Sequence, residues 1–182
     1  MRQAAAALLL LAASPAAAAN WTVDPARSRL GFTATWLGKP VEGTFKSWNA
    51  RIAFDPAAPA GASIDVTVDL GSAVTGDRTV DGALPDSDWF AVKTAPRARF
   101  VATKVSKTAT GWLAAGTLTI KGRSAPVDLP FTLAVAGDTA TVAGTARVDR
   151  RSWQIGMGSD ATAEYVAFPV TIRLALVARK AP

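Results

Sequence analysis

The chain has 182 residues and a formal net charge of +6, and it contains neither cysteine nor histidine. The missing cysteines exclude disulfides, thiolate metal sites and a cysteine nucleophile. The missing histidines remove the usual acid–base group near neutral pH and the commonest metal ligand. We therefore expect no enzyme of the zinc hydrolase or Ser-His-Asp type, no catalytic residue and no metal site. The stability of the fold must come from a hydrophobic core.

The first 19 residues, MRQAAAALLLLAASPAAAA, have the pattern of a secretory signal peptide. Arg2 precedes an apolar run that ends in small residues of the Ala-x-Ala type. This run is shorter than the about 20 apolar residues that a membrane-spanning helix needs. We therefore expect cleavage between Ala19 and Asn20 and a periplasmic or secreted location. Residues 20–182 then form a single domain, large enough for one hydrophobic core.

The basic residues are dispersed along the chain, and the densest stretches are ARVDRR and ARKAP. A nucleic-acid-binding surface would instead concentrate Lys and Arg in a stripe with interleaved aromatic residues. We therefore expect no nucleic-acid partner. The basic residues are interpreted as solvated surface, or as a weak attraction to anionic lipid head groups that would allow peripheral contact with a membrane.

Alternation of apolar and polar residues dominates the chain and is typical of half-buried β-strands. Phe32 and Trp36 share one face of the first strand, and the parity changes within residues 46–49, which predicts a bulge or corner. The Gly-Asp pair at 137–138 predicts a hairpin turn. The predicted strands are residues 30–36, 41–54, 63–72, 97–106, 111–122, 125–135, 140–150 and 168–179. Eight strands at this short spacing predict an all-β fold, an antiparallel barrel or sandwich.

The segment from Thr75 to Pro96 interrupts the alternation. Val80 and Leu84 are four residues apart, which predicts one or two helical turns, and Pro85 ends them. A connection of this length in a β-domain is uncommon and usually functional. We therefore expect a short helical lid over one mouth of a barrel.

Two carboxylates, Asp86 and Asp88, lie beside Trp89 and Phe90 in this segment. An envelope enzyme could use Asp86 together with Asp88 or with Asp149 for acid–base chemistry. Asp86 and Asp88 are explained more simply as N-caps and turn formers of a second short turn, which is the interpretation we favour.

Four segments in the same order resemble the YceI-like family of exported lipid-binding proteins: WTVDPARSRLGFTATWLGKPVEGTFKSWNARIAFD, SDWFAVKTAPRARF, GTLTIKGRSAPVDLPF and ARVDRRSWQIGMG. The third, for example, is close to the family's G-x-L-T-I-K-G-V-T-x-P-V. The resemblance implies an eight-stranded, lipocalin-like antiparallel barrel that holds a polyprenyl lipid or an isoprenoid quinone in its apolar interior. It implies no enzymatic mechanism and no other cofactor.

The chain departs from the family at three places where relatives usually carry histidine. Arg27, Trp36 and Ala83 stand there instead. We therefore expect that a bound lipid is held by apolar contacts more than by a titratable polar group.

Bulky apolar residues of the predicted strands and lid are the candidates for the wall of a lipid pocket. They are Phe32, Trp36, Phe45, Phe54, Leu84, Trp89, Phe90, Phe100, Leu118, Ile120, Phe131 and Trp153. Each one singly is also explained as ordinary core. Arg150 and Arg151 are candidates for a rim that binds a polar or anionic head group, because a guanidinium suits phosphate; a solvated turn with local ion pairs is the other interpretation.

The predicted function is therefore an extracytoplasmic binding protein or carrier for a long-chain isoprenoid lipid. The alternative is an interaction module of the envelope, with a filled core and no ligand, that docks on a membrane protein such as a b-type cytochrome. Monomer and dimer both remain open, because uncovered strand edges could pair.

Overall fold

The computed structural model describes residues 19–181, so the predicted signal peptide lies outside the described residues except for Ala19. The strands are β1 (Asn20–Val23), β2 (Arg29–Trp36), β3 (Lys39–Phe45), β4 (Trp48–Ala53), β5 (Ser63–Asp69), β6 (Ala73–Val74), β7 (Arg97–Lys107), β8 (Trp112–Ile120), β9 (Arg123–Ala136), β10 (Thr139–Asp149) and β11 (Pro169–Lys180). Helix α1 spans Arg78–Ala83, and the 3₁₀ turns are η1 (Pro25–Arg27), η2 (Pro59–Gly61), η3 (Leu70–Ser72) and η4 (Arg150–Trp153).

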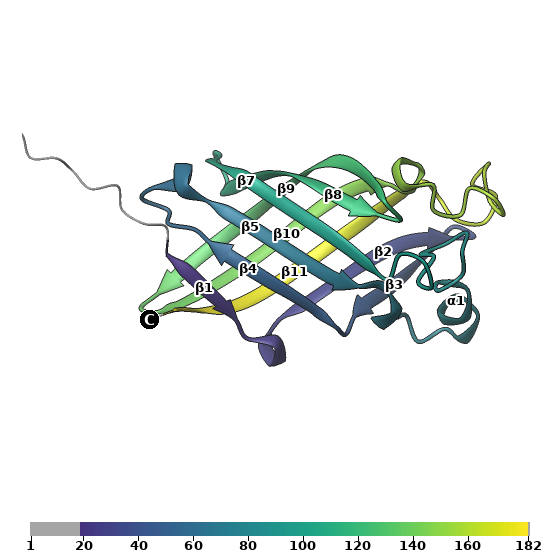
Figure 1. Ribbon diagram of the computed structural model, residues 1–182, viewed down its shortest axis with the longest axis horizontal. Helices are drawn as coiled ribbons and strands as arrows, with labels where there is room; N and C mark the ends of the chain where they lie inside the picture. The colour runs from purple at the N-terminus through teal and green to yellow at the C-terminus, as the bar shows by residue number, and fades with distance from the viewer. Residues whose placement is uncertain (1–18, 182) are drawn as a thin grey trace, which may run out of the picture.

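All strands belong to one antiparallel sheet, which closes on itself through β1 and β11 (Figure 1). Strands β1 and β2 follow one another along the same edge of β11 and together fill one position of the barrel. Strands β3 and β4 fill the next position in the same way, and β5 and β6 the third. With β7 to β11, this makes eight strand positions, and the predicted eight-stranded antiparallel barrel is confirmed.

The predicted corner lies between β3 and β4. Strand β3 ends at Phe45 and β4 begins at Trp48, so the two intervening residues turn the chain without pairing in the ladder. The hydroxyl of Ser72 accepts a hydrogen bond from the Ser47 N–H at 3.0 Å and so holds this bend. The change of parity in the sequence is thus a bend within one strand position of the barrel.

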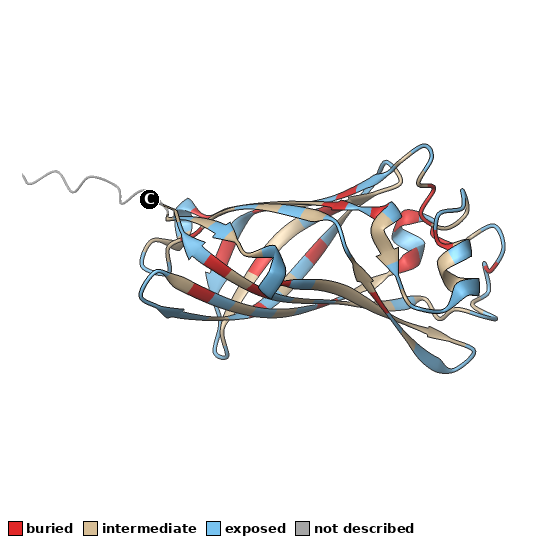
Figure 2. Ribbon diagram, turned by 90° about the horizontal axis from the view of Figure 1, so that it is seen from below, coloured by how far each residue is buried: buried red, intermediate tan, exposed pale blue. Residues whose placement is uncertain are grey.

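The hydrophobic residues form two clusters inside the barrel, and the exposed residues lie on its outside and in its loops (Figure 2). The larger cluster lies toward the end that carries α1. The smaller cluster fills the opposite end, next to the chain termini. There the ring of Phe54 packs edge-on against Trp112, with ring centroids 5.0 Å apart, and against Phe131 at 6.1 Å. This aromatic plug closes the base of the barrel.

Two inward-facing glycines let aromatic rings lie flat along the wall. The Phe32 ring lies over Gly43 on the neighbouring strand, and the Phe100 ring lies over Gly116. A Cβ atom at Gly116 would lie 2.5 Å from the Phe100 ring and 2.7 Å from the carbonyl oxygen of Val101. The glycines therefore keep these rings out of the barrel axis.

No helix among residues 19–181 is both long enough and apolar enough to cross a lipid bilayer.

Replacing Gly116 with alanine should destabilise the fold by about 1–3 kcal/mol, because the backbone of β7 cannot move away from the added methyl group. The free energy of unfolding from denaturant titration measures this loss. Gly82→Ala is the matched control: its Cβ would meet no atom within 4 Å, and alanine favours helix α1 by up to about 1 kcal/mol. Equal stability of the two variants would contradict the close packing at Gly116.

Candidate functional site

A cavity of about 240 Å³ lies inside the barrel, and its wall presents only apolar atoms. Side chains from the strands and from both loops at the α1 end form this wall. Ten of the twelve apolar residues predicted from the sequence belong to it: Phe32, Phe45, Leu84, Trp89, Phe90, Phe100, Leu118, Ile120, Phe131 and Trp153. Six of these residues lie on strands, and the alternation placed them on the inward face. Leu84, Trp89, Phe90 and Trp153 come instead from the lid and from η4, where no alternation applies.

Two of the predicted residues lie beyond the two ends of the cavity. Trp36 has the inward parity but is the last residue of β2, where it forms an isolated bridge with Val166 at the α1 end of the barrel. Phe54 follows β4 and belongs to the aromatic plug at the base. Neither lines the cavity, because parity sets the face of a strand and not the position along the barrel axis.

Other wall residues were not predicted as site residues, although the same alternation contains them. Examples are Leu30, Ala34, Trp48, Val66, Val68, Leu129, Ile172, Leu174 and Leu176. Trp112 in the basal plug shares the parity of Leu118 and Ile120 and could have been found in the same way.

The lid packs onto the barrel through an aromatic cluster. Asp77 caps helix α1, because its carboxylate accepts hydrogen bonds from the N–H groups of Thr79 and Val80 at 2.8 and 3.1 Å. After the helix, Phe90 packs against Phe32 and Phe45, with ring centroids 6.4 and 6.2 Å away. The lid thus forms part of the cavity wall.

Asp88 links the lid to residues 154–167, the loop that follows η4. Its carboxylate accepts hydrogen bonds from the N–H groups of Gly158 and Ser159 at 2.7 and 2.8 Å, and from the Ser159 hydroxyl at 2.6 Å. Burial alone would raise the pKa of Asp88, but these hydrogen bonds and the charge of Lys121 outweigh it and lower the pKa. The expected N-cap of a second short turn is therefore wrong for Asp88, because its carboxylate joins two loops.

A buried ion pair organises this loop. The side chains of Arg150 and Asp160 are 2% and 1% exposed and lie 2.8 Å apart. The guanidinium also donates to the carbonyl oxygens of Ile155, Asp160 and Val166, at 2.7, 2.7 and 2.8 Å. Arg150 therefore directs its donors into the loop, and only apolar atoms of it reach the cavity wall.

The second rim candidate, Arg151, is half exposed. It forms an ion pair with Asp149 and stacks over the ring of Phe168 at 4.3 Å. Of the two predicted head-group residues, Arg151 is thus the one that an external group can reach. Its role in binding a head group stays a prediction.

Trp153 joins the loop to the barrel wall. Its side chain is 2% exposed, and its indole N–H donates to the carbonyl oxygen of Leu118 at 3.0 Å. The polar atom of this large side chain is thereby satisfied away from the cavity, which leaves the ring as apolar wall.

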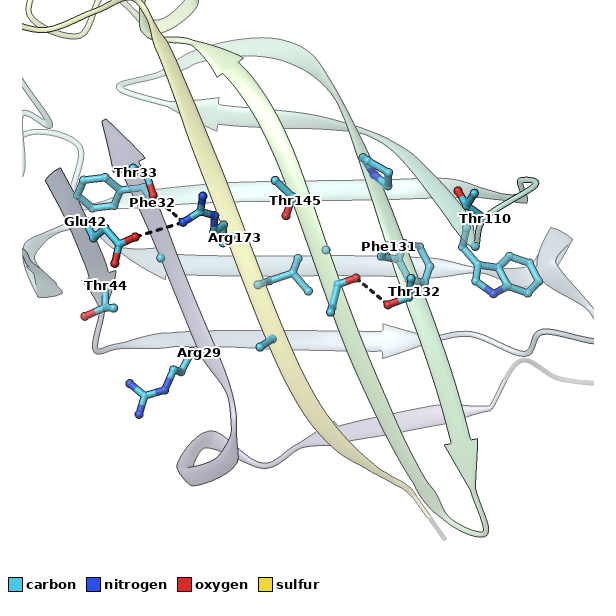
Figure 3. A pocket seen from close by; sticks show the side chains of 18 of the residues that line it. Arg29, Phe32, Thr33, Glu42, Thr44, Thr110, Phe131, Thr132, Thr145 and Arg173 are labelled. Atoms are coloured by element: carbon cyan, nitrogen blue, oxygen red, sulfur yellow. Dashed lines mark hydrogen bonds and ion pairs between the residues drawn. The ribbon is translucent and has the colours of Figure 1, made fainter. Parts of the chain in front are cut away.

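A second, larger hollow of about 660 Å³ lies on the outside of the barrel, over β2, β3, β9, β10 and β11 (Figure 3). Polar side chains such as Thr33, Thr132 and Thr145 share its wall with apolar side chains, and Arg173 pairs with Glu42 at 3.3 Å. This groove is open to solvent and contains charged groups, so it does not enclose a hydrocarbon chain away from water as the internal cavity does. The internal cavity is therefore the candidate site for an apolar ligand.

Within residues 19–181, no three acidic side chains gather in a way that could hold a metal ion. The carboxylate of Asp88 is occupied by the facing loop, and that of Asp149 accepts hydrogen bonds from Arg151.

A closed antiparallel barrel with an apolar interior and a capped mouth has the architecture of the lipocalin-like barrels. A family model described as the YceI-like domain matches residues 21–178. The chain therefore belongs to the YceI-like family, as its sequence motifs indicated.

Curated relatives share this region. A UPF0312 protein of Photorhabdus laumondii is 35% identical over 117 residues, which are 63% of this chain and 61% of the relative. Protein YceI of Escherichia coli is 30% identical over 126 residues, 68% of this chain and 66% of the relative. The matched region thus spans less than two-thirds of the length of each of these relatives.

Solved structures share the fold. BcnA of Burkholderia cenocepacia is 35% identical, with a TM-score of 0.80 over 85% of this chain and 98% of its own. A YceI protein of Campylobacter jejuni is 25% identical, with a TM-score of 0.67 over 78% and 86% of the two chains. A polyisoprenoid-binding domain from Saccharophagus degradans, at 15% identity, has a TM-score of 0.67 over 88% and 98% and shares the fold alone.

Replacing Asp160 with asparagine should cost about 3–5 kcal/mol, because it leaves the buried Arg150 guanidinium without its counter-charge. The stability should also depend less on pH. Burial raises the pKa of Asp160, but the N–H groups of Val166 and Tyr165 and the charge of Arg150 lower it overall. The native pair therefore stabilises the fold above the unfolded pKa of about 3.9, and this contribution is lost as the pH falls through the lower folded pKa.

Denaturant titrations at several pH values between neutral and strongly acidic measure both effects. Asp128→Asn, an exposed substitution on β9, is the control and should change the stability by no more than about 0.5 kcal/mol. A variant at Asp160 as stable as this control would show that the ion pair does not support the loop.

Proposed function

We propose that this protein is an extracytoplasmic binding protein or carrier for a long-chain isoprenoid lipid, either a polyprenyl lipid or an isoprenoid quinone. The observation that carries the proposal is the internal cavity, whose wall is apolar throughout. A hydrocarbon chain leaves water without losing hydrogen bonds, whereas a polar ligand would lose its own in such a cavity. The alternative of a filled core without ligand does not account for this space.

The size of the cavity limits how the chain is held. Typical small-molecule sites have volumes of roughly 300–1,000 Å³, so about 240 Å³ accommodates one segment of a long chain. The rings of Phe32, Phe45 and Phe90 pack together at the lid end of the wall. They would have to rotate before a longer segment of the lipid tail could enter. We infer that the tail enters the barrel and the head group stays at the mouth, where Arg151 is exposed.

Membership of the YceI-like family supports the proposal, and one structural neighbour is described as a polyisoprenoid-binding domain. The proposed location outside the cytoplasm rests on the signal-peptide pattern of residues 1–19. We propose no catalytic role, in keeping with the absence of histidine and cysteine from the chain.

Native mass spectrometry of the protein purified from its own cell envelope should show an additional mass, and lipid extraction should identify it as an isoprenoid. Added polyprenol or quinone should restore the complex after delipidation. Ala50→Trp places a large side chain in the cavity wall and should lower retention at least roughly tenfold, because the added indole occupies the space of the tail.

Ala134→Trp is the matched control, because it adds the same side chain at an exposed position of β9 and should leave retention unchanged. The proposal fails if the native protein carries no lipid and binds neither polyprenol nor quinone. It also fails if the two tryptophan variants retain lipid equally well.

A further inference from the structure

Two exposed apolar residues lie side by side at the end of the barrel that carries the lid. Leu37, at the tip of the β2–β3 hairpin, is 61% exposed, and Tyr165, in the loop after η4, is 47% exposed. The N–H of Leu37 donates to the carbonyl oxygen of Tyr165 at 2.7 Å. The hairpin tip and this loop both lie at the α1 end, far from the C-terminus (Figure 1). We call Leu37 and Tyr165 the rim pair.

Leucine does not suit the hairpin turn in which it stands. Leu37 and Gly38 join the paired residues Trp36 and Lys39, and both have positive φ angles, 48° and 76°. This is the signature of a type I′ turn, in which Asn-Gly is the favoured pair. A positive φ is unfavourable for leucine, and its exposed side chain adds apolar surface to water.

The other two-residue hairpin turns of the described chain are polar at their tips. The β8–β9 turn holds Lys121 and Gly122, and the β9–β10 turn holds Gly137 and Asp138. Neither turn stability nor solubility thus explains Leu37. Removal of its side chain from water by a bound partner would explain it.

The rim pair lies next to residues at the lid end of the cavity. Val166 lines the cavity, and the next residue toward the N-terminus is Tyr165. Trp36, the residue before Leu37, bridges to Val166. Leu37 and Tyr165 are therefore each one residue along the chain from the bridged pair Trp36 and Val166, beside the mouth of the cavity.

We propose that the rim pair docks the barrel, lid end first, on the interfacial region of a phospholipid bilayer. This rests on the proposed function, because a lipid cargo enters and leaves the barrel from a membrane. Tyrosine is favoured at membrane interfaces, and Lys39 beside the turn can place its stem on apolar surface and its ammonium group among head groups. The charges next to the rim pair in the chain are of both signs, Lys39 after the turn and Glu164 before Tyr165, so the contact is mainly apolar.

Co-sedimentation of the full chain with phosphatidylcholine vesicles, with and without phosphatidylglycerol, tests the proposal. The native protein should bind both kinds of vesicle with similar affinity. Leu37→Asn should weaken vesicle binding roughly tenfold or more, because it removes the leucine side chain that the bilayer would bury. The same variant should unfold at an equal or higher temperature, because Asn-Gly fits the type I′ turn. A purely structural leucine would instead lower the unfolding temperature when replaced.

Val135→Asn is the matched control: Val135 is 48% exposed but lies beside the β9–β10 hairpin at the opposite end of the barrel. It should leave vesicle binding unchanged. The proposal is overturned if the native protein and Leu37→Asn bind vesicles equally well. It is also overturned if Val135→Asn weakens vesicle binding as much as Leu37→Asn does. It is also overturned if the native protein forms a dimer that Leu37→Asn dissociates, since a second copy would then cover the rim pair.

Lipid retention by the same variants separates this proposal from the proposed function. A protein that retains isoprenoid lipid but does not bind vesicles contradicts only the docking of the rim pair. A protein that binds vesicles through Leu37 but never carries lipid contradicts the carrier function and leaves the docking surface in place.

Discussion

Closure of the sheet along β11 is the constraint on which the rest of the structure depends. One edge of this twelve-residue strand pairs with both β1 and β2, and the other edge pairs with β10, so the sheet has a single interior. Each alternating strand must then direct its apolar residues to the same space. That space stays partly empty because aromatic rings lie flat over Gly43 and Gly116. The cavity is thus a direct consequence of strand alternation combined with small residues opposite large ones.

The polar groups near the mouth serve to hold the loops that close it. Arg150 and Asp160 shape the loop after η4, and Asp88 fastens the lid to that loop. Because these buried polar atoms bond to one another and to the backbone, none of them faces the cavity. A ligand inside the barrel is therefore bound by dispersion contacts and by the hydrophobic effect. Neither interaction requires a hydrocarbon chain of one fixed length. Discrimination between ligands would have to arise at the mouth, where a head group meets solvent.

Much of this architecture was predictable, and the failures have a common physical origin. Period-two alternation identified the strands, the corner after Phe45 and the predicted wall residues that lie on strands, because the face of a residue depends only on its own strand. Trp36 and Phe54 were predicted as wall residues but lie beyond the two ends of the cavity, since their depth depends on how the strands are staggered. Arg150 looked like a solvated rim residue, and its burial depends on a loop that returns Asp160 to it.

The sequence by itself determined what the interior is made of and which chemistries are absent. The lack of histidine and cysteine and the alternation of apolar residues are local properties that hold in any compact form of the chain. Only the tertiary structure decided the volume of the cavity, the partner of Arg150 and the meeting of Leu37 with Tyr165. The cavity and the meeting of Leu37 with Tyr165, 128 positions apart, depend on closure of the sheet, and the partner of Arg150 depends on how its loop folds back. No local pattern of the sequence records these contacts.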